Sequence, residues 1–356
     1  MVKLFGVFIL IFIVVGIIVK FLWETFFAND EEKAVYDKLI EGGITLILAT
    51  IPSFSESLLQ FLYDFLNVEK SVAINELSPW WLVALGLLLL SVGVILKIID
   101  ASAKCVILNM PGTIHHTKDD GILKALNTNN CDEIKISAAN CQTEMQKISQ
   151  TKVNAVLSDI KLQMDRFNRM SNYKRCFTGM APIPYVILAG TKHTGSDIRY
   201  YLEFNKATQQ YTKLNNEKKY PKLIKSEIVT IDTNEIVVSV SITAVINDTN
   251  TKQFKMPVFN LSLEKTKDNA IYSKKQLNEY VDDTVTFISE VCKKNSNIAR
   301  VNLLLATQAC FAYALGVALV LMQNRVPQIV SYHYVAPSYT TGIVINGRES
   351  GHIVKV

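Results

Sequence analysis

Hydrophobic residues are concentrated in two long runs near the start of the chain, and beyond them they recur at the shorter periods of strands and helices. Residues 4–19 contain no charged side chain, and this run reaches residue 23 if Lys20 extends its ammonium group to the lipid headgroups. Residues 80–99 form a second run that begins with two tryptophans, which are frequent at membrane interfaces. Because about 20 helical residues cross a hydrocarbon layer, we expect transmembrane helices at residues 4–23 and 80–99. The first is expected to be an uncleaved anchor, since no clear small-x-small cleavage site follows it.

From residue 102 onward, short apolar strands alternate with helices. Strands are predicted at residues 104–110, 133–137, 175–178, 198–204, 235–246, 254–263, 301–305 and 328–334, and helices at residues 141–170, 182–188, 273–292 and 309–322. This succession is typical of an α/β fold with a largely parallel sheet. We therefore predict a transmembrane region at residues 1–101, with a loop at 24–79, followed by two α/β units at 102–230 and 231–356.

Charge orients the predicted membrane region. The chain as a whole carries a formal net charge of +5, but residues 24–79 contain ten acidic residues against three lysines. From Lys97 to the end there are 32 basic and 22 acidic residues. The positive-inside rule then predicts a cytoplasmic N-terminus, an external acidic loop and a cytoplasmic C-terminal region. Within the loop, residues 54–66 predict an amphipathic helix, which would lie on the membrane, pack against its own copies or pack against the rest of the loop.

Cysteine usage bears on the compartment. All six cysteines lie in the C-terminal region and none forms a CxxC pair; they are Cys105, Cys131, Cys141, Cys176, Cys292 and Cys310. An even number is compatible with disulfides, but scattered cysteines within apolar or helical stretches more often act as small hydrophobic residues. The pattern therefore favours a reducing compartment, in agreement with the charge distribution.

The two α/β units are related by an internal repeat. Setting Gly190 on Gly316 aligns MAPIPYVILAG with ATQACFAYALG, so that Met180 matches Ala306 and Pro184 matches Cys310. Each block follows a short predicted strand and precedes another. The alignment indicates that the second unit arose by duplication of the first.

These blocks also carry a family resemblance. FTGMAPIPYVILAG followed by YLEF, and LLLATQACFAYALG followed by VSYHY, resemble the SAVED sensor domain, a fusion of two CARF-like Rossmannoid units, over about residues 103–356. Where such domains often have a small-residue and proline segment before the second ALG block, this chain has Thr307-Gln308. The resemblance implies binding of a cyclic oligonucleotide made by a partner nucleotidyltransferase in a CBASS anti-phage system. A SAVED domain on two N-terminal helices is similar to the membrane-anchored effectors of those systems, which implies the bacterial inner membrane.

Candidate ligand residues follow from where strands lead into helices. In an open α/β sheet, ligands gather at the carboxyl ends of the strands, where helix N-termini suit phosphates. The candidate loops contain Met180, Ala181 and Pro182 in the first unit and Thr307, Gln308 and Ala309 in the second, with the strand exits at 111–113 and 241–243 as secondary candidates. Nearby basic residues that could neutralise phosphate are Lys192, His193 and Arg199, and tyrosines that could stack on bases are Tyr200, Tyr332, Tyr334 and Tyr339. Each tyrosine alone is also typical of a strand residue packed between helix and sheet.

Signals for other chemistry are weak. Residues 190–196 have the glycine spacing of a P-loop, but the residue after Gly195 is not lysine, so this is not a Walker A motif. His115 and His116 near Asp119 lack the spacing of a metal site. We therefore predict no catalytic residue, metal or cofactor. No helix-turn-helix, zinc finger or continuous basic stripe predicts a duplex nucleic-acid partner.

The sequence thus predicts a membrane effector rather than an enzyme. A cyclic di- or trinucleotide would bind across the two CARF-like units, induce a homo-oligomer and drive the helix pairs together, which would disrupt the lipid bilayer. One alternative is a membrane-tethered ring nuclease that degrades the cyclic oligonucleotide. A second alternative is a membrane scaffold that binds no nucleotide.

Overall fold

The computed structural model describes residues 35–48, 80–102, 104–112, 120–126, 131–137, 145, 147–195, 197–321 and 327–356. It divides into two compact units, Met1–Ala103 and Lys104–Val356. The predicted helices at residues 4–23 and 54–66 lie outside the described residues. Each unit is therefore described by itself.

The N-terminal unit contains two helices packed against each other, α2 (Val35–Leu48) and α4 (Trp80–Ser102). Glycines allow their close approach, because a Cβ atom on Gly43 would lie 2.6 Å from the carbonyl oxygen of Gly86. Helix α4 covers the second predicted membrane span. Within the described part of the chain, no helix combines the length and the apolar character needed to cross a membrane. The two spanning helices therefore stay predictions.

The second unit begins with a five-stranded sheet in the order β2-β1-β3-β4-β5. Its strands are β1 (Cys105–Met110), β2 (Cys131–Lys135), β3 (Lys174–Gly179), β4 (Tyr200–Asn205) and β5 (Gln210–Lys213). All neighbours are parallel except β5, which runs antiparallel to β4. The accompanying helices are α5 (Asp120–Leu126), α6 (Gln150–Arg169) and α7 (Ile183–Thr191).

A second sheet repeats this arrangement. Its order is β12-β11-β10-β9-β7-β8-β6, and the run from β8 to β11 has the strand order and directions of the first sheet. The strands are β6 (Ile224–Lys225), β7 (Glu235–Ser241), β8 (Val258–Ser262), β9 (Arg300–Ala306), β10 (Gln328–Val335), β11 (Ser338–Val344) and β12 (Ile353–Lys355). The helices are α8 (Asp248–Thr251), the 3₁₀ turn η4 (Lys252–Phe254), α9 (Lys274–Lys294) and α10 (Ala309–Leu321). The α/β class and its largely parallel sheets are confirmed.

Several element boundaries differ from those predicted. Helix α6 begins at Gln150 rather than at residue 141, because the Ser149 side chain accepts a hydrogen bond from the Lys152 N–H and caps the helix. Strand β8 begins at Val258 rather than at residue 254, since η4 precedes it and Lys255 has a left-handed backbone with φ of 48°. Strand β6 precedes the predicted boundary at residue 230, yet it pairs with β8 in the second sheet.

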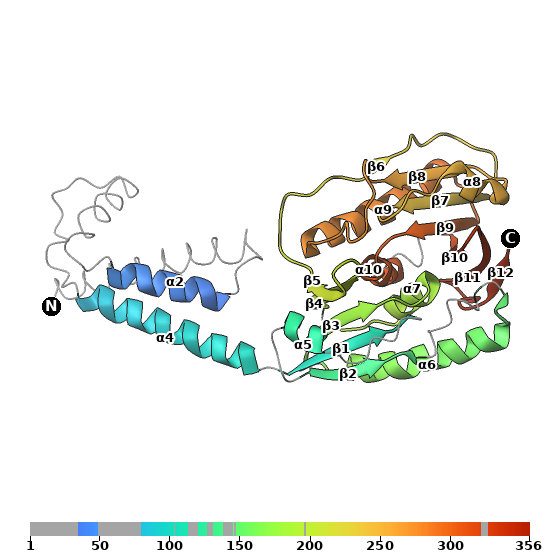
Figure 1. Ribbon diagram of the computed structural model, residues 1–356. Helices are drawn as coiled ribbons and strands as arrows, with labels where there is room; N and C mark the ends of the chain where they lie inside the picture. Colours follow the sequence, from blue (N-terminus) through green and yellow to red (C-terminus); the bar gives the residue numbers. More distant parts are fainter. Residues whose placement is uncertain are drawn as a thin grey trace, which may run out of the picture. The chain divides into compact units, whose positions relative to one another are not determined.

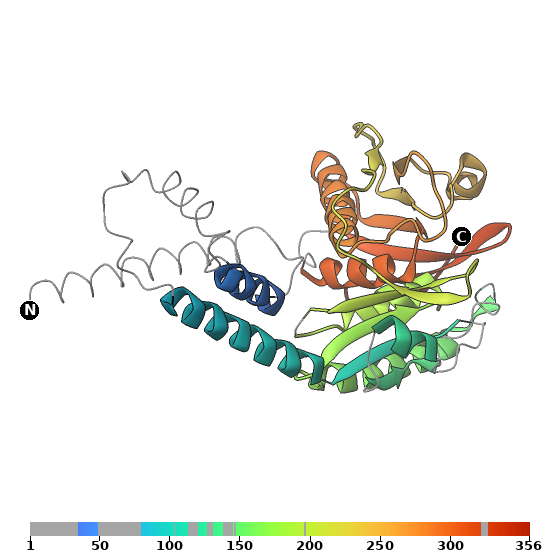
Figure 2. The ribbon, with the colours of Figure 1, turned by 60° about the vertical axis from the view of Figure 1, so that its left-hand side comes forward.

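The two sheets share one hydrophobic core, with α7 and α10 packed against each other between them (Figures 1 and 2). The helices meet at the two glycines that the internal repeat aligns. A Cβ atom on Gly190 would lie 3.0 Å from the Gly316 Cα and would collide with the carbonyl oxygen of Tyr313; one on Gly316 would collide with that of Ile187. Residues 187 and 313 are themselves aligned by the repeat, so the contact is reciprocal.

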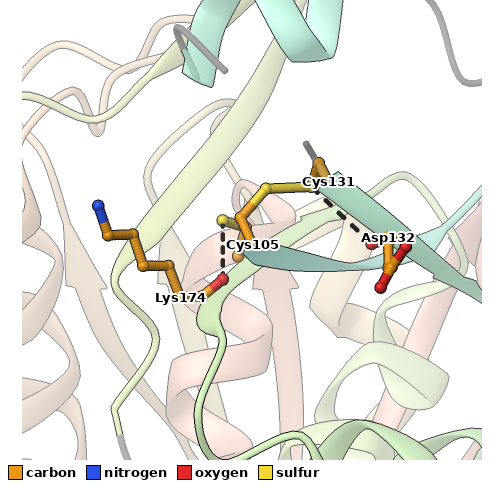
Figure 3. Close-up of a disulfide and its surroundings, with 5 residues drawn as sticks. Cys105, Cys131, Asp132 and Lys174 are labelled. Atoms are coloured by element: carbon orange, nitrogen blue, oxygen red, sulfur yellow. Dashed lines mark hydrogen bonds between the residues drawn. A yellow bond between two sulfur atoms is a disulfide. The ribbon is translucent and has the colours of Figure 1, made fainter. Parts of the chain in front are cut away.

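One cysteine pair departs from the sequence prediction. Cys105 and Cys131 are register partners at the start of the parallel strands β1 and β2, their Cα atoms lie 4.6 Å apart, and they form a disulfide (Figure 3). Their adjacency could not be predicted because they lie 26 positions apart in sequence and meet only through the pairing of two strands. Cys176 and Cys310 are buried free thiols, as expected of small hydrophobic residues. The cysteines therefore no longer support a reducing compartment, and the predicted orientation rests on charge alone.

The glycine contact can be tested by Gly316→Ala. The new methyl group would collide with backbone that cannot rotate away, and we expect a loss of about 1–3 kcal/mol in the free energy of unfolding, measured by urea denaturation. Gly121→Ala is the matched control, since it is also helical and its Cβ would meet only the Tyr211 ring at 3.7 Å. That control should change stability by less than about 1 kcal/mol. Equal effects of the two substitutions would contradict a tight crossing at Gly316.

The disulfide makes a separate prediction. Closing a loop with a sequence separation of 26 should stabilise the fold by about 3 kcal/mol. The double variant Cys105→Ala, Cys131→Ala should therefore unfold at a lower urea concentration, with a free energy of unfolding smaller by about 3 kcal/mol. Dithiothreitol should lower the stability of the wild type and leave that of the double variant unchanged. Cys292→Ala, which removes a free thiol, should keep the wild-type response. A wild type insensitive to reductant would mean that the bond does not stabilise the fold.

Candidate functional site

A cleft of about 350 Å³ lies where the carboxyl ends of strands from both sheets meet. Four strand exits line it: Gly112 after β1, Gly179–Ala181 at the end of β3, Thr243 after β7, and Thr307–Ala309 after β9. Strand β1 has β2 on one side and β3 on the other, and β7 has β8 and β9 in the same way, so the exits of these strands are topological switch points. Ligands of open α/β sheets bind at such points. The duplication therefore places two equivalent binding edges around one cleft.

Helices α7 and α10 both begin at this cleft, with Ile183 and Ala309 among its lining residues. The first turn of a helix presents backbone N–H groups and the positive end of the helix dipole. At α7 the second helical residue is Pro184, which has no N–H to offer, and no side chain caps the helix. At α10 the corresponding residue is Cys310, whose N–H is already bound.

The partner of that N–H is Glu203 from β4. Its Oε1 accepts a hydrogen bond of 2.7 Å from the Cys310 N–H. A carboxyl group from the first sheet therefore caps α10, the helix that follows β9 of the second sheet. Burial raises the pKa of Glu203 to about 7, against the lowering effect of the bonds from Cys310 and Gln308. The cleft thus contains an acid whose charge changes near neutral pH.

The loop before α10 is held by the segment that precedes α9. The Gln308 side chain accepts a hydrogen bond from the Ile271 N–H at 2.6 Å and donates one to the Ile271 oxygen at 2.9 Å. Its amide groups are therefore used within the fold. The neighbouring Thr307 Oγ1 is buried and has no hydrogen-bond partner among the described residues. Asp268 and Asn269 from the same segment also line the cleft.

Strands β4 and β10 complete the wall with residues that the sequence analysis did not select. Phe204 and Lys206 lie at the end of β4, and His333 lies on β10. Burial lowers the pKa of His333 to about 4, so its imidazole is neutral near pH 7. Together the cleft offers an aromatic ring, a cation and several hydrogen-bonding groups, a combination that suits an anionic ligand with bases.

The predicted loop residues lie in this cleft. Met180, Ala181, Thr307, Gln308 and Ala309 all line it, and Pro182 follows directly as the N-terminal cap of α7. Of the secondary candidates, Gly112 and Thr243 line it as well.

The predicted basic cluster lies elsewhere. Lys192 and His193 follow the far end of α7, about 13 Å of helix away from its first turn. Arg199 and Tyr200 stand at the amino end of β4, where the Arg199 N–H bonds the Arg175 oxygen, whereas the cleft is at the carboxyl end. The His193 Nδ1 instead lies 3.0 Å from the Tyr313 hydroxyl.

The three tyrosines of the second sheet do not line the cleft either. Tyr332 is buried and donates its hydroxyl to Asn302 Oδ1 at 3.0 Å, while Tyr339 is buried against Phe254. Tyr334 is 42% exposed and its ring lies beside that of Tyr339. Packing within the sheet accounts for the positions of Tyr332 and Tyr339.

Among the described residues, no three His, Cys, Asp or Glu side chains are grouped so that they could hold a metal ion.

Comparisons with known proteins agree with this architecture. Residues 160–345 match the model of the SAVED family, described as the SMODS-associated and fused to various effectors sensor domain. Two similar solved structures are those of the Acinetobacter baumannii Cap4 SAVED/CARF-domain containing receptor with the cyclic trinucleotides 2′3′3′-cAAA and 3′3′3′-cAAA. They are 13% and 14% identical to this chain, each with a TM-score of 0.50, and each match covers 74% of this chain and 56% of the receptor. Identity this low shows a likeness of fold. No curated protein sequence matches the chain.

Proposed function

The chain belongs to the SAVED family of sensor domains, and from that premise we propose that it binds a cyclic oligonucleotide in the cleft between its two sheets. The observation that carries the proposal is the convergence of four strand exits and the first turns of α7 and α10 on one cavity of about 350 Å³. Phosphates suit the ammonium group of Lys206, and bases suit Phe204 and the polar groups of Asp268 and Asn269. The ligand would be a cyclic di- or trinucleotide of a CBASS-type system, and the chain would act as a receptor, not an enzyme.

The proposal extends to the membrane. The uncharged run at residues 4–19 and the apolar composition of α4 support attachment to a lipid bilayer. On α4 the large apolar side chains that are exposed are Leu82, Leu87, Leu88, Val92, Val94, Ile95 and Leu96. Such a face costs free energy in water and is stabilised by lipid or by other apolar helices. The proposed response to the ligand is assembly of several copies, clustering of their N-terminal helices and disruption of the inner membrane, with the sensor unit in the cytoplasm.

Ligand binding can be tested by calorimetric titration of the full chain in detergent with 3′3′3′-cAAA, 2′3′3′-cAAA and cyclic di-adenylate, with linear triadenylate as the control. We expect at least one cyclic compound to bind and the linear one to bind at least tenfold more weakly. Lys206→Glu, which reverses a charge in the cleft, should weaken binding about tenfold or more, equivalent to about 1.4 kcal/mol. Lys192→Glu makes the same change at the far end of α7 and should alter affinity less than about twofold, because charges that far apart are screened. Failure of every cyclic compound to bind would overturn the proposal.

Membrane attachment can be tested by flotation with vesicles of phosphatidylethanolamine and phosphatidylglycerol. Leu88→Arg should reduce the bound fraction, because an arginine at the centre of an inserted helix costs about 2.5–3.5 kcal/mol on insertion scales. Leu162→Arg on α6 is the matched control, since Leu88 and Leu162 are each 59% exposed. The control should float as the wild type does. Equal flotation of the wild type and Leu88→Arg would exclude α4 from the membrane contact.

A further inference from the structure

Glu203 and His333 occupy equivalent positions in the two halves of the duplication. The repeat that sets Gly190 on Gly316 also sets Thr178 of β3 on Leu304 of β9. Thr178 pairs with Leu202 in the first sheet, and Leu304 pairs with Tyr332 in the second. Glu203 directly follows Leu202, and His333 directly follows Tyr332, so the two residues are equivalent. Both line the cleft. Equivalent places around one cleft thus carry a carboxyl group in one half and an imidazole in the other.

The two halves differ in what these residues do. Strand β4 packs on α10, and β10 packs on α7, so each residue belongs to a strand that contacts the helix of the other half. Glu203 is 7% exposed and caps α10 through the Cys310 N–H. The position equivalent to Cys310 in α7 is Pro184, which has no N–H for an acceptor to bind. The Glu203 carboxyl group therefore has a partner on α10, the helix of the other half, whereas an acid at residue 333 would lack the equivalent partner on α7.

A carboxylate at this place would also repel an anionic ligand. It occupies the first turn of α10, where it is favoured by the helix dipole. A phosphate brought to the same turn would meet a like charge in a partly buried setting, where the repulsion is screened far less than in water. The opposite half presents the neutral imidazole of His333, and none of the residues that line the cleft places a carboxylate at the first turn of α7.

We infer that Glu203 is a positioning residue that excludes ligand phosphate from the α10 half of the cleft and so directs an anionic ligand to the half formed by α7 and His333. This inference rests on the proposed function. With Glu203 charged, only one half of the duplicated cleft accepts phosphate, so the ligand binds in a single orientation. It also couples binding to protonation, because an anion in the cleft favours the uncharged form of Glu203, whose pKa of about 7 lies within reach.

The groups around Glu203 allow this protonation to be isolated. On α10 the nearest titratable group is the Cys310 thiol, whose pKa is raised well above its usual value by burial, so it stays uncharged. On β10, His333 is neutral above pH 6. The remaining charged residues of the cleft are Lys206 at the end of β4 and Asp268 before α9. Phosphodiesters stay ionised between pH 6 and 8, so a pH dependence in this range reports on Glu203.

The test measures the affinity of the full chain for 3′3′3′-cAAA between pH 6 and 8. We expect wild-type affinity to rise from pH 8 to pH 6 by up to about tenfold, because the protonated fraction of a group with pKa near 7 rises by that factor. Glu203→Gln keeps an oxygen for the Cys310 N–H and should bind at all pH values as the wild type binds at pH 6. Glu227→Gln, an exposed residue that does not line the cleft, is the matched control and should follow the wild type.

A second variant, His333→Glu, tests the orientation of the ligand. His333→Glu places a carboxylate in the half assigned to phosphate and should weaken binding at pH 8 more than tenfold, while its melting temperature confirms that it folds. Weaker binding by Glu203→Gln would show that the carboxylate contacts the ligand directly and would overturn the inference, as would a wild-type affinity independent of pH. Failure of the wild type to bind any cyclic compound overturns the proposed function, and the inference falls with it.

Discussion

The close crossing of α7 and α10 at Gly190 and Gly316 is the contact on which the rest of the fold depends. Any larger residue at either position would collide with the backbone of the other helix. Because the helices touch there, both sheets close on one core, and the two helix N-termini come to the same end of the unit. The cleft is therefore a consequence of the crossing. The reciprocal contact of Ile187 and Tyr313 with the two glycines makes the arrangement nearly two-fold.

Much of this architecture could be predicted from the sequence because duplication leaves a signal independent of propensity. The match of Gly190 to Gly316 located both helices, and apolar runs located the strands that precede them. The prediction of element boundaries was less accurate where a side chain decides them: Ser149 caps α6, which begins at Gln150, nine residues after the predicted start. The disulfide between Cys105 and Cys131 escaped prediction, since it depends on two strand starts becoming neighbours in a sheet.

The candidate site divides in the same way. Loop residues such as Ala181 and Ala309 could be predicted, because strand exits bind ligands in any open α/β sheet. Lys192 and Arg199 looked close to them in sequence, but α7 carries the chain to the opposite edge. Glu203 and His333 gave no motif, since each is one polar residue at the end of an apolar strand. They are recognised as equivalent only from the strand register, by comparing the pairing of β4 with β3 to that of β10 with β9.

In the proposed receptor, the same crossing limits how a ligand can act on the fold. Bound ligand would contact the first turns of α7 and α10, and helices in backbone contact at glycines have no side chains between them to absorb a shift. In the proposed receptor, a displacement at the cleft would then be passed on as a shift of one half against the other. The chain enters the first half at β1, three residues after α4 ends, where the Cys105–Cys131 bond holds β1 to β2. Any rotation of that half would move β1 and β2 together, so in the proposed effector the link from the sensor to the N-terminal helices would begin at a fixed strand.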